Sequence, residues 1–167
     1  MHFEDSELFF SSSNNTIKDN IFLETDLAAM AFLNADNNRI ENNIINISLY
    51  HGITLEFGSH NIINRNFFYY AGIGIDISGG GDPHLAVNNT VTDNIIKNSP
   101  QGIWLHGAAD STAIERNIIK ENNDGIYLGV ASNSIIHDNT LINNSQIGIR
   151  AGFAYGHPTS NNNLIYR

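Results

Sequence analysis

Asn15-Thr16-Ile17-Lys18-Asp19-Asn20 is the first of six copies of one phrase, Asn/Ser/Thr-x-(Ile/Val)-x-x-Asn. The asparagines that close the copies are Asn20, Asn43, Asn66, Asn94, Asn117 and Asn139. The steps between them are 23, 23, 28, 23 and 22 residues. A period of this length is too short for repeats built from helix pairs, and it is typical of one turn of a β-coil.

A second phrase follows eight or nine residues after most of these asparagines. It reads Gly-Ile-x and then mostly Leu or Ile, and its copies begin at Gly52, Gly74, Gly102, Gly125 and Gly148. Alternation of apolar and polar residues predicts strands with one buried face. Short strands that stack on the same strands of the next coil make a parallel β-helix. We therefore predict an all-β solenoid of about six to seven coils with a period of 22–23 residues.

The repeat also predicts which side chains fill the interior. One coil cannot bury its own apolar face, so the fold depends on contacts between neighbouring coils. We expect three stacked columns: Ile17, Ile40, Ile63, Val91, Ile114, Ile136 and Ile165; Phe22, Ile45, Phe68, Ile96, Ile119 and Leu141; and Ile53, Ile75, Ile103, Ile126 and Ile149. The recurring asparagines are expected to form a ladder at a turn, with amides bonding to amides and to the backbone.

Both ends of the chain read as parts of coils. Asn163-Leu164-Ile165-Tyr166-Arg167 is the first phrase without its closing asparagine, and Glu7-Leu8-Phe9-Phe10 reads as the tail of a preceding coil. Solenoids need covered ends. We expect residues 1–167 to be a single β-helix domain that is part of a longer solenoid or is covered by a partner chain.

Composition limits the classes of partner. The net charge of -9 argues against a nucleic-acid binder, and an acidic polysaccharide would need a local basic patch or a bridging Ca²⁺. The absence of Cys excludes disulfides and thiolate metal sites. No apolar run is long enough to span a bilayer, and Met1–Asp5 does not look like the start of a signal peptide. Either the chain is cytoplasmic or its leader has been removed, and we favour an extracellular or cell-surface location.

Two longer connections and one row of side chains suggest a binding face. The connections contain extra residues at Ser78–Leu85 and Gly152–Pro158, and the second holds Tyr155 and His157. Insertions on one side of a repeat protein often mark its binding face, although tolerated surface loops give the same pattern. The variable residues of the second phrase should form an outward row between them: Thr54, Asp76, Trp104, Tyr127 and Arg150, with Glu56 and His106 just beyond.

This row has the chemistry of a sugar site. Trp104 and Tyr127 would form an exposed aromatic shelf for the apolar faces of sugar rings. Asp76 and Arg150 at its ends can bind hydroxyls or carboxylates. The competing interpretation is a solvent-facing strand row whose aromatic residues merely favour strands. His51, His60 and His137 are expected on turns or elsewhere on the surface.

The two repeated phrases resemble the right-handed parallel β-helix repeats of the pectin-lyase-like superfamily, over nearly the whole chain. In addition, Asp82-Pro83-His84 resembles the Asp-Pro-His core of mannuronan 5-epimerases. That resemblance implies that Asp82 and His84 are active-site residues and that His84 transfers a proton. Tyr127 or His106 would supply another proton, and Arg150 the cation that neutralises a uronate. The chain departs from the family at Gly79-Gly80-Gly81, where a catalytic Tyr is expected.

We therefore predict a carbohydrate-active protein that binds or acts on a polysaccharide as an epimerase, lyase or hydrolase. The predicted catalytic residues are Asp82, His84, Asp76, His106, Tyr127 and Arg150, and the predicted substrate-binding residues are Trp104, Tyr127, Tyr155 and His157. No metal site and no cofactor are predicted, with Ca²⁺ left open. Two alternatives are a non-catalytic glycan-binding solenoid and a structural spacer.

Overall fold

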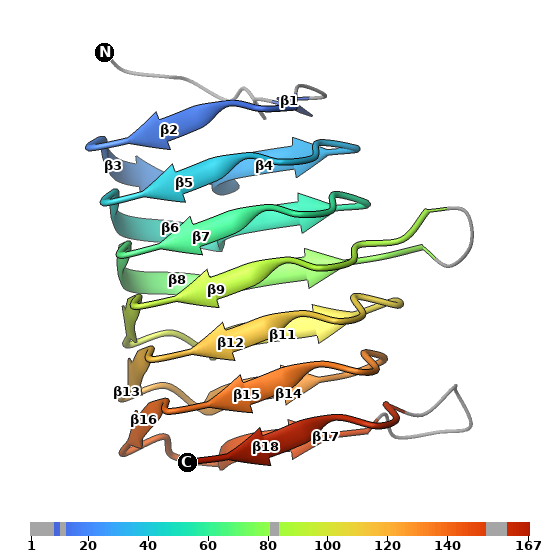
Figure 1. Ribbon diagram of the computed structural model, residues 1–167. Coiled ribbons are helices and arrows are strands. Elements are labelled where there is room, and N and C mark those ends of the chain that lie inside the picture. Colours follow the sequence, from blue (N-terminus) through green and yellow to red (C-terminus); the bar gives the residue numbers. More distant parts are fainter. Residues whose placement is uncertain (1–8, 11–12, 81–83, 153–159) are drawn as a thin grey trace.

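The computed structural model describes residues 9–10, 13–80, 84–152 and 160–167. In these ranges the chain forms strands and no helix, and it winds into a solenoid of about six turns (Figure 1). Every pair of neighbouring strands is parallel. The predicted all-β parallel solenoid is therefore confirmed.

Two sheets form the wall of the solenoid. The seven-stranded sheet carries the first phrase of each repeat and contains β2 (Thr16–Lys18), β5 (Arg39–Glu41), β7 (Ile62–Asn64), β9 (Thr90–Thr92), β12 (Ala113–Glu115), β15 (Ile135–His137) and β18 (Leu164–Tyr166). The eleven-stranded sheet contains β1 (Phe9–Phe10), β3 (Ile21–Thr25), β4 (Ala28–Leu33), β6 (Ile44–Glu56), β8 (Phe67–Ser78), β10 (Ile95–Lys97), β11 (Gln101–His106), β13 (Ile118–Lys120), β14 (Asp124–Leu128), β16 (Thr140–Ile142) and β17 (Ile147–Ala151).

The eleven-stranded sheet has two arms. The first arm comprises β3, β10, β13, β16 and the beginnings of β6 and β8, and the second arm comprises β4, β11, β14, β17 and the ends of β6 and β8. The second arm carries the Gly-Ile-x phrases. The two longer connections, which follow β8 and β17, leave the molecule on the same side (Figure 1).

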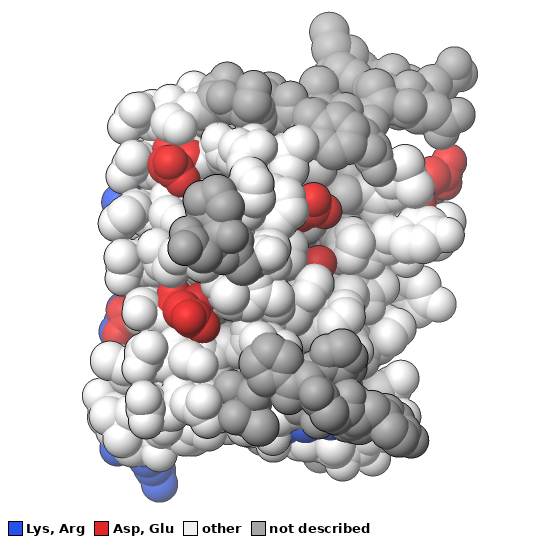
Figure 2. All heavy atoms as spheres, turned by 90° about the vertical axis from the view of Figure 1, so that its right-hand side faces the viewer, with Lys and Arg blue, Asp and Glu red and all other residues white. Residues whose placement is uncertain are grey.

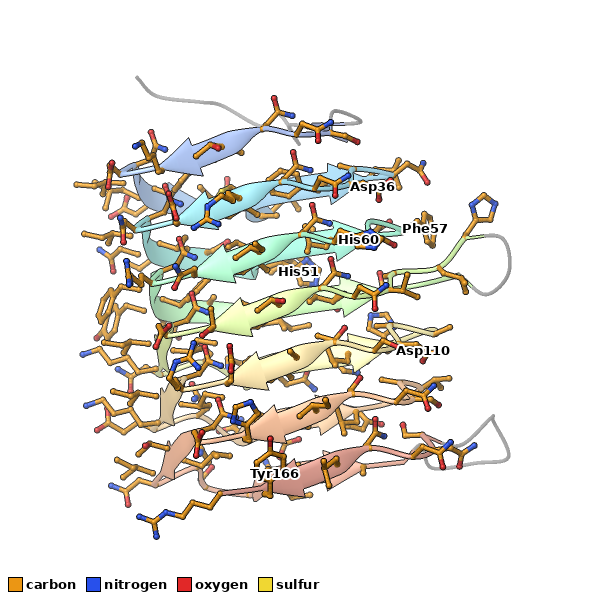
Figure 3. All side chains as sticks on the ribbon, in the orientation of Figure 1. Asp36, His51, Phe57, His60, Asp110 and Tyr166 are labelled. Carbon is orange, nitrogen blue, oxygen red and sulfur yellow. The ribbon has the colours of Figure 1, made fainter. Side chains whose placement is uncertain are left out.

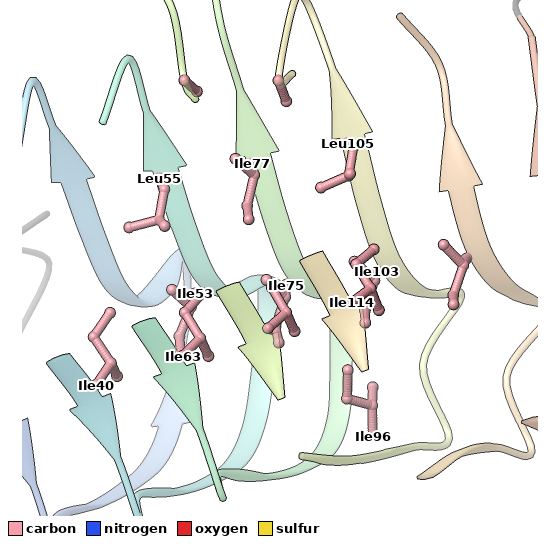
Figure 4. Packing of buried hydrophobic residues seen from close by; sticks show 14 of the residues in the cluster. Ile40, Ile53, Leu55, Ile63, Ile75, Ile77, Ile96, Ile103, Leu105 and Ile114 are labelled. Carbon is pink, nitrogen blue, oxygen red and sulfur yellow. The ribbon is translucent and has the colours of Figure 1, made fainter. Parts of the chain in front are cut away.

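The interior columns have the register that the repeat predicted, but Ile165 in the column of the seven-stranded sheet is 46% exposed. Strand register aligns Ile17, Ile40, Ile63, Val91, Ile114, Ile136 and Ile165 on the seven-stranded sheet. The two other columns are aligned in the same way on the two arms. Ile40, Ile63 and Ile114 face Ile53, Ile75 and Ile103 across the core (Figure 4). Each fully buried Ile contributes roughly 1.5–3 kcal/mol, so the columns supply most of the favourable free energy of folding.

The predicted asparagine ladder is confirmed. The side-chain oxygen of Asn66 accepts hydrogen bonds from the backbone N–H and the side-chain amide of Asn43, at 2.9 and 3.0 Å. The same pair of bonds recurs along the column from Asn20 to Asn139. A second ladder, which the sequence analysis did not predict, links Asn15, Asn38, Asn61 and Asn89 at the start of the first phrase.

The corners of each coil are made by residues with positive φ. One column precedes the ladder asparagines and consists of Asp19, Asn42, Arg65, Asp93, Arg116 and Asp138, with φ between 54° and 57°. Another lies between the two arms and consists of Glu24, Ile47, Tyr70, Asn98, Glu121 and Asn143. Asn and Asp tolerate this left-handed conformation better than other residues with a side chain, which is one reason why the chain is rich in Asn.

Candidate functional site

The predicted row of variable residues exists on the second arm. Strand register pairs Thr54 with Asp76, Asp76 with Trp104, Trp104 with Tyr127, and Tyr127 with Arg150. We call these five residues the outer row. They come from the five consecutive strands β6, β8, β11, β14 and β17, so the row runs along the axis of the solenoid.

Asp76 lies between two imidazoles. His51 Nε2, from the coil before, is 3.5 Å from Asp76 Oδ2, and His106 Nε2, from the coil after, is 3.0 Å from Asp76 Oδ1. The Asp76 side chain is only 8% exposed, whereas those of His51 and His106 are 30% and 31% exposed. We call these three residues the His–Asp–His group. Its carboxylate is withdrawn from water while both rings remain accessible.

The aromatic residues of the outer row are stacked on one another. The Trp104 ring lies 4.2 Å from the His106 ring and 5.8 Å from the Tyr127 ring, and Trp104 and Tyr127 are nearly parallel, at 5°. The Arg150 guanidinium lies 5.2 Å from the centre of the Tyr127 ring. Tyr127 is only 9% exposed. The expected open shelf is therefore wrong in one respect: neighbouring side chains cover the ring faces that a sugar would need.

Arg150 is also engaged by a carboxylate. Its Nη2 lies 3.4 Å from Asp124 Oδ2, and the side chain of Asp124 is 10% exposed. Along the axis, the strand of Asp76 is followed by that of Trp104 and His106, then by that of Asp124 and Tyr127, and then by that of Arg150.

Polar atoms without an aligned hydrogen bond gather on this arm. The described residues contain eight buried side-chain atoms of this kind, and six lie on the second arm: Thr54 Oγ1, Asp76 Oδ1, Gln101 Oε1, Trp104 Nε1, His106 Nε2 and Asp124 Oδ1. The 3.0 Å contact between His106 and Asp76 is thus an ion contact without a well-directed hydrogen bond. Six buried polar atoms of this kind therefore lie on the arm that carries the outer row, and two of them, Asp76 Oδ1 and His106 Nε2, contact each other.

A hollow adjoins the His–Asp–His group. It has a volume of about 320 Å³, and its lining includes Tyr50, His51, Thr54 and Glu56 together with apolar residues of β4. His51 therefore touches both the hollow and Asp76. A ligand in the hollow would meet an imidazole whose other side is held by a carboxylate.

The comparison with known families agrees with this architecture. The family model described as a right-handed β-helix region matches residues 4–117 and again residues 33–167. The chain belongs to the right-handed β-helix family. This confirms the handedness that the resemblance implied, but not the resemblance to mannuronan 5-epimerases. Comparisons with curated proteins and with solved structures gave no significant match.

A shared β-helix fold does not define a reaction, so function has to be argued from the site. Charge is the first constraint. The chain has eight Lys and Arg residues: Lys18, Arg39, Arg65, Lys97, Arg116, Lys120, Arg150 and Arg167. Arg150 alone lies on a strand of the second arm. On the side of the β-helix where the long connections leave, Asp and Glu are spread over the surface, and Lys and Arg appear only near its margins (Figure 2).

The described contacts of His84 are with Phe57 and Gly80. Its ring packs against Phe57 with 5.5 Å between ring centres, and its carbonyl oxygen accepts a 2.6 Å hydrogen bond from the Gly80 N–H. Phe57 lies on the same side of the solenoid as Asp36 and His60 (Figure 3). Among the described residues, no contact joins His84 to the outer row. Asp82, Tyr155 and His157 lie outside the described residues.

Sequence reasoning missed two members of the site. His51 was expected on a turn or elsewhere on the surface, but it lies within β6, three residues before Thr54, and contacts Asp76. Asp124 lies three residues before Tyr127 in β14 and contacts Arg150. His51 and Asp124 each stand directly before the glycine of a Gly-Ile-x phrase. This shared position is the signal in the sequence that could have identified both residues.

In the described part of the chain, no group of three or more His, Asp or Glu side chains is arranged so that it could hold a metal ion. The same residues include no helix that is long and apolar enough to cross a bilayer.

Proposed function

We propose that this β-helix protein acts on a polysaccharide that lies along the second arm, with acid–base chemistry at His51, Asp76 and His106. The observation that supports the proposal most strongly is the buried Asp76 carboxylate between the Nε2 atoms of two accessible imidazoles. Imidazole is the side chain that most readily exchanges protons near neutral pH. A carboxylate behind it orients the ring and stabilises its protonated form.

An extended polymer suits the shape of the site. The outer row spans five strands, and with strands about 4.8 Å apart it is on the order of 20 Å long. The partly exposed His106 and Arg150 and the exposed Glu56 beside the row offer both donors and acceptors to sugar hydroxyls. The stacked rings would meet such a chain at their edges rather than at their faces.

The charges favour a neutral glycan over a uronate. Epimerisation or elimination of a uronate needs a cation beside its carboxylate. Arg150 is the one Lys or Arg on the second arm, and it is already paired with Asp124 and stacked on Tyr127. Glycoside hydrolysis needs no such cation, because it uses two carboxyl groups.

Glu56 is the second carboxylate within reach of the same site. Register pairs Glu56 with Ser78 and Thr54 with Asp76, so Glu56 and Asp76 lie on adjacent strands, two residues apart along them. Their Cα atoms are therefore about 8 Å apart, which leaves room for a glycosidic bond between the side chains. Glu56 is exposed and Asp76 is buried. One carboxyl group of the pair is therefore open to solvent, and the other is held between His51 and His106.

A structural solenoid is the second candidate, and one observation favours it. The continuous stack from His106 to Arg150 covers its own ring faces, as a purely stabilising ladder would. In that case the outer row would contribute to stability and would bind no glycan.

Activity on a panel of neutral and uronate polysaccharides separates these possibilities. Release of reducing ends would be measured for the wild type, Asp76→Asn and Glu56→Gln. We expect hydrolysis of a neutral glycan that falls at least about 100-fold in both variants. The control is Asp19→Asn, the same change at an exposed corner far from the site. Undiminished turnover in Asp76→Asn would contradict the proposal, and unsaturated uronate ends would point to elimination instead of hydrolysis.

A further inference from the structure

A second hollow lies at the corner between the two arms, apart from the outer row. Its volume is about 500 Å³. Its walls come from four consecutive coils: the middle of β6, the middle of β8, and the corners before β11 and β14. Leu49, Tyr70 and Pro100 supply apolar surface, and Asn98, Glu121 and Asn123 supply polar groups.

The aromatic ring in this hollow is open, unlike those of the outer row. Tyr70 is 57% exposed, and Leu49 beside it is also 57% exposed. Among the described residues, Tyr70 makes no stacking and no cation–π contact, whereas the nearby Lys97 ammonium lies over Phe67 and Tyr69. An exposed tyrosine ring with aliphatic neighbours offers the flat apolar surface on which a sugar ring packs.

The backbone holds Tyr70 in an unfavourable conformation. Its φ is 60°, in the left-handed region, where a bulky side chain costs roughly 1–2 kcal/mol. Other coils place Asn98 and Asn143 at the same corner, and Asn adopts this conformation at less cost. The left-handed conformation at this corner is therefore less favourable for tyrosine than for asparagine. Ile47 and Glu121 adopt the same conformation at this corner in other coils, so the positive φ belongs to the coil and only the choice of tyrosine is particular to this one.

A local irregularity builds the other wall. The register between β6 and β8 shifts between Ser48 and His51, so that Leu49 and Tyr50 form a bulge opposite Gly72. A Cβ at Gly72 would lie 2.5 Å from the carbonyl oxygens of both Leu49 and Tyr50. Only glycine allows the bulge to pack here, and the bulge is what projects Leu49 beside the hollow. Bulges often redirect side chains next to binding sites.

The chemistry of the lining identifies the kind of ligand. Carboxamides of Asn98 and Asn123 both donate and accept hydrogen bonds, and the exposed Glu121 carboxylate accepts them. Among the described residues, no Lys or Arg lines the hollow. Hydroxyl groups can satisfy all three polar side chains, whereas a uronate would meet Glu121 without a compensating cation. We propose that this corner is a second carbohydrate-binding site, which holds a neutral sugar with its ring face against Tyr70.

The strain at Tyr70 allows binding to be tested separately from folding. Tyr70→Asn removes the ring and relieves the backbone, so the variant stays folded, with an unchanged or higher Tm. Ile47→Asn is the matched control, because Ile47 occupies the same corner one coil earlier with φ 64° and does not line the hollow. Binding of neutral oligosaccharides of six β-linked glucose or xylose units, and of a uronate oligomer of equal length, would be measured by calorimetry and NMR.

We expect a neutral oligomer to shift the NMR signals of Tyr70 and Leu49. Its affinity at this corner should fall at least tenfold in Tyr70→Asn and stay unchanged in Ile47→Asn. Equal affinity in Tyr70→Asn, preference for the uronate, or the absence of any shift at Tyr70 would each overturn the proposal. The two proposals can fail separately. The turnover of Asp76→Asn tests the site on the outer row, and the NMR shifts at Tyr70 test this second site.

Discussion

The side-chain oxygen of Asn94 accepts two hydrogen bonds from Asn66, one from its backbone N–H at 2.9 Å and one from its side-chain amide at 3.1 Å, across 28 residues of sequence. The Asn94 amide in turn donates to the carbonyl oxygens of Ile63 and Thr92 and to the side chain of Asn117. Asn94 is 0% exposed. One side chain thus joins three coils, and it needs both an acceptor and a donor to do so.

Replacing Asn94 should destabilise the solenoid strongly. Asn94→Asp keeps the acceptor but turns a carboxylate toward two carbonyl oxygens, and Asn94→Ala leaves buried groups of three coils unpaired. We expect both changes to lower the free energy of unfolding by at least about 2 kcal/mol in urea titrations. Asn139→Ala, at a half-buried position near the last coil, is the control and should cost less. Equal losses at the two positions would show that burial does not set the strength of the ladder.

The glycine of the second phrase should be irreplaceable within the stack. A Cβ at Gly102 would lie 2.4 Å from the carbonyl oxygen of Gly125 and 2.8 Å from the Ile119 side chain. Gly148 occupies the same place in the phrase, but a Cβ there would meet only Leu141, at 3.9 Å. Gly102→Ala should therefore lower stability by about 2 kcal/mol or more, whereas Gly148→Ala should be tolerated within about 0.5 kcal/mol. Thermal unfolding of the two variants side by side tests this difference.

The sequence predicted the fold well because the repeat states the register directly. Asn43 and Asn66 recur at a fixed spacing, and Ile40 and Ile63 keep a constant offset from them, so alignment of the phrases is alignment of the coils. The residues with positive φ at the corners were harder to predict from the sequence. Arg65 and Tyr70 adopt positive φ although neither residue type favours it, because the coil closes only with a left-handed residue at each corner.

The site was predicted only in part, for a similar reason. Period-two alternation places Asp76, Trp104 and Tyr127 on one outer row, and register confirms this. It does not give side-chain torsions, and these decide that the Trp104 ring packs on His106 and Tyr127 instead of presenting a face to solvent. His51 was missed because it reaches Asp76 from an adjacent coil and from a different level along the strand.

Trp104 should contribute to stability as well as to any ligand contact. Trp104→Ala removes both of its stacking contacts, and we expect a loss of about 2–4 kcal/mol in the free energy of unfolding. Trp104→Phe retains a ring between His106 and Tyr127 and should lose less than about half of that. Tyr50→Ala, at a position 61% exposed, is the control and should have little effect. An unchanged unfolding midpoint in Trp104→Ala would mean that the ring stack does not hold the coils together.

Acid should weaken one surface ion pair on the opposite wall. Arg116 Nε lies 3.1 Å from Asp93 Oδ1, and this hydrogen bond from the guanidinium lowers the pKa of Asp93 below its usual value of 3.8. A lowered carboxyl pKa in the folded state contributes stability that is present above the unfolded pKa and is lost as the pH falls through the folded pKa. Both side chains are more than a third exposed, so water screens the pair and its contribution is small.

Arg116→Gln should therefore lower the Tm at about pH 7 by no more than about 2 °C, and this difference should shrink as the pH falls below 3.8, where Asp93 is protonated first in the unfolded state and then, at lower pH, in the folded state. Glu115, whose Oε2 lies 2.8 Å from Arg116 Nη1, should add to the loss in the same direction. Lys120→Gln removes a cation that has no ion pair among the described residues, so it serves as the control for net charge. If the Tm difference between Arg116→Gln and the wild type grew as the pH fell, while Lys120→Gln showed no such trend, the ion pair would not be the source of the effect.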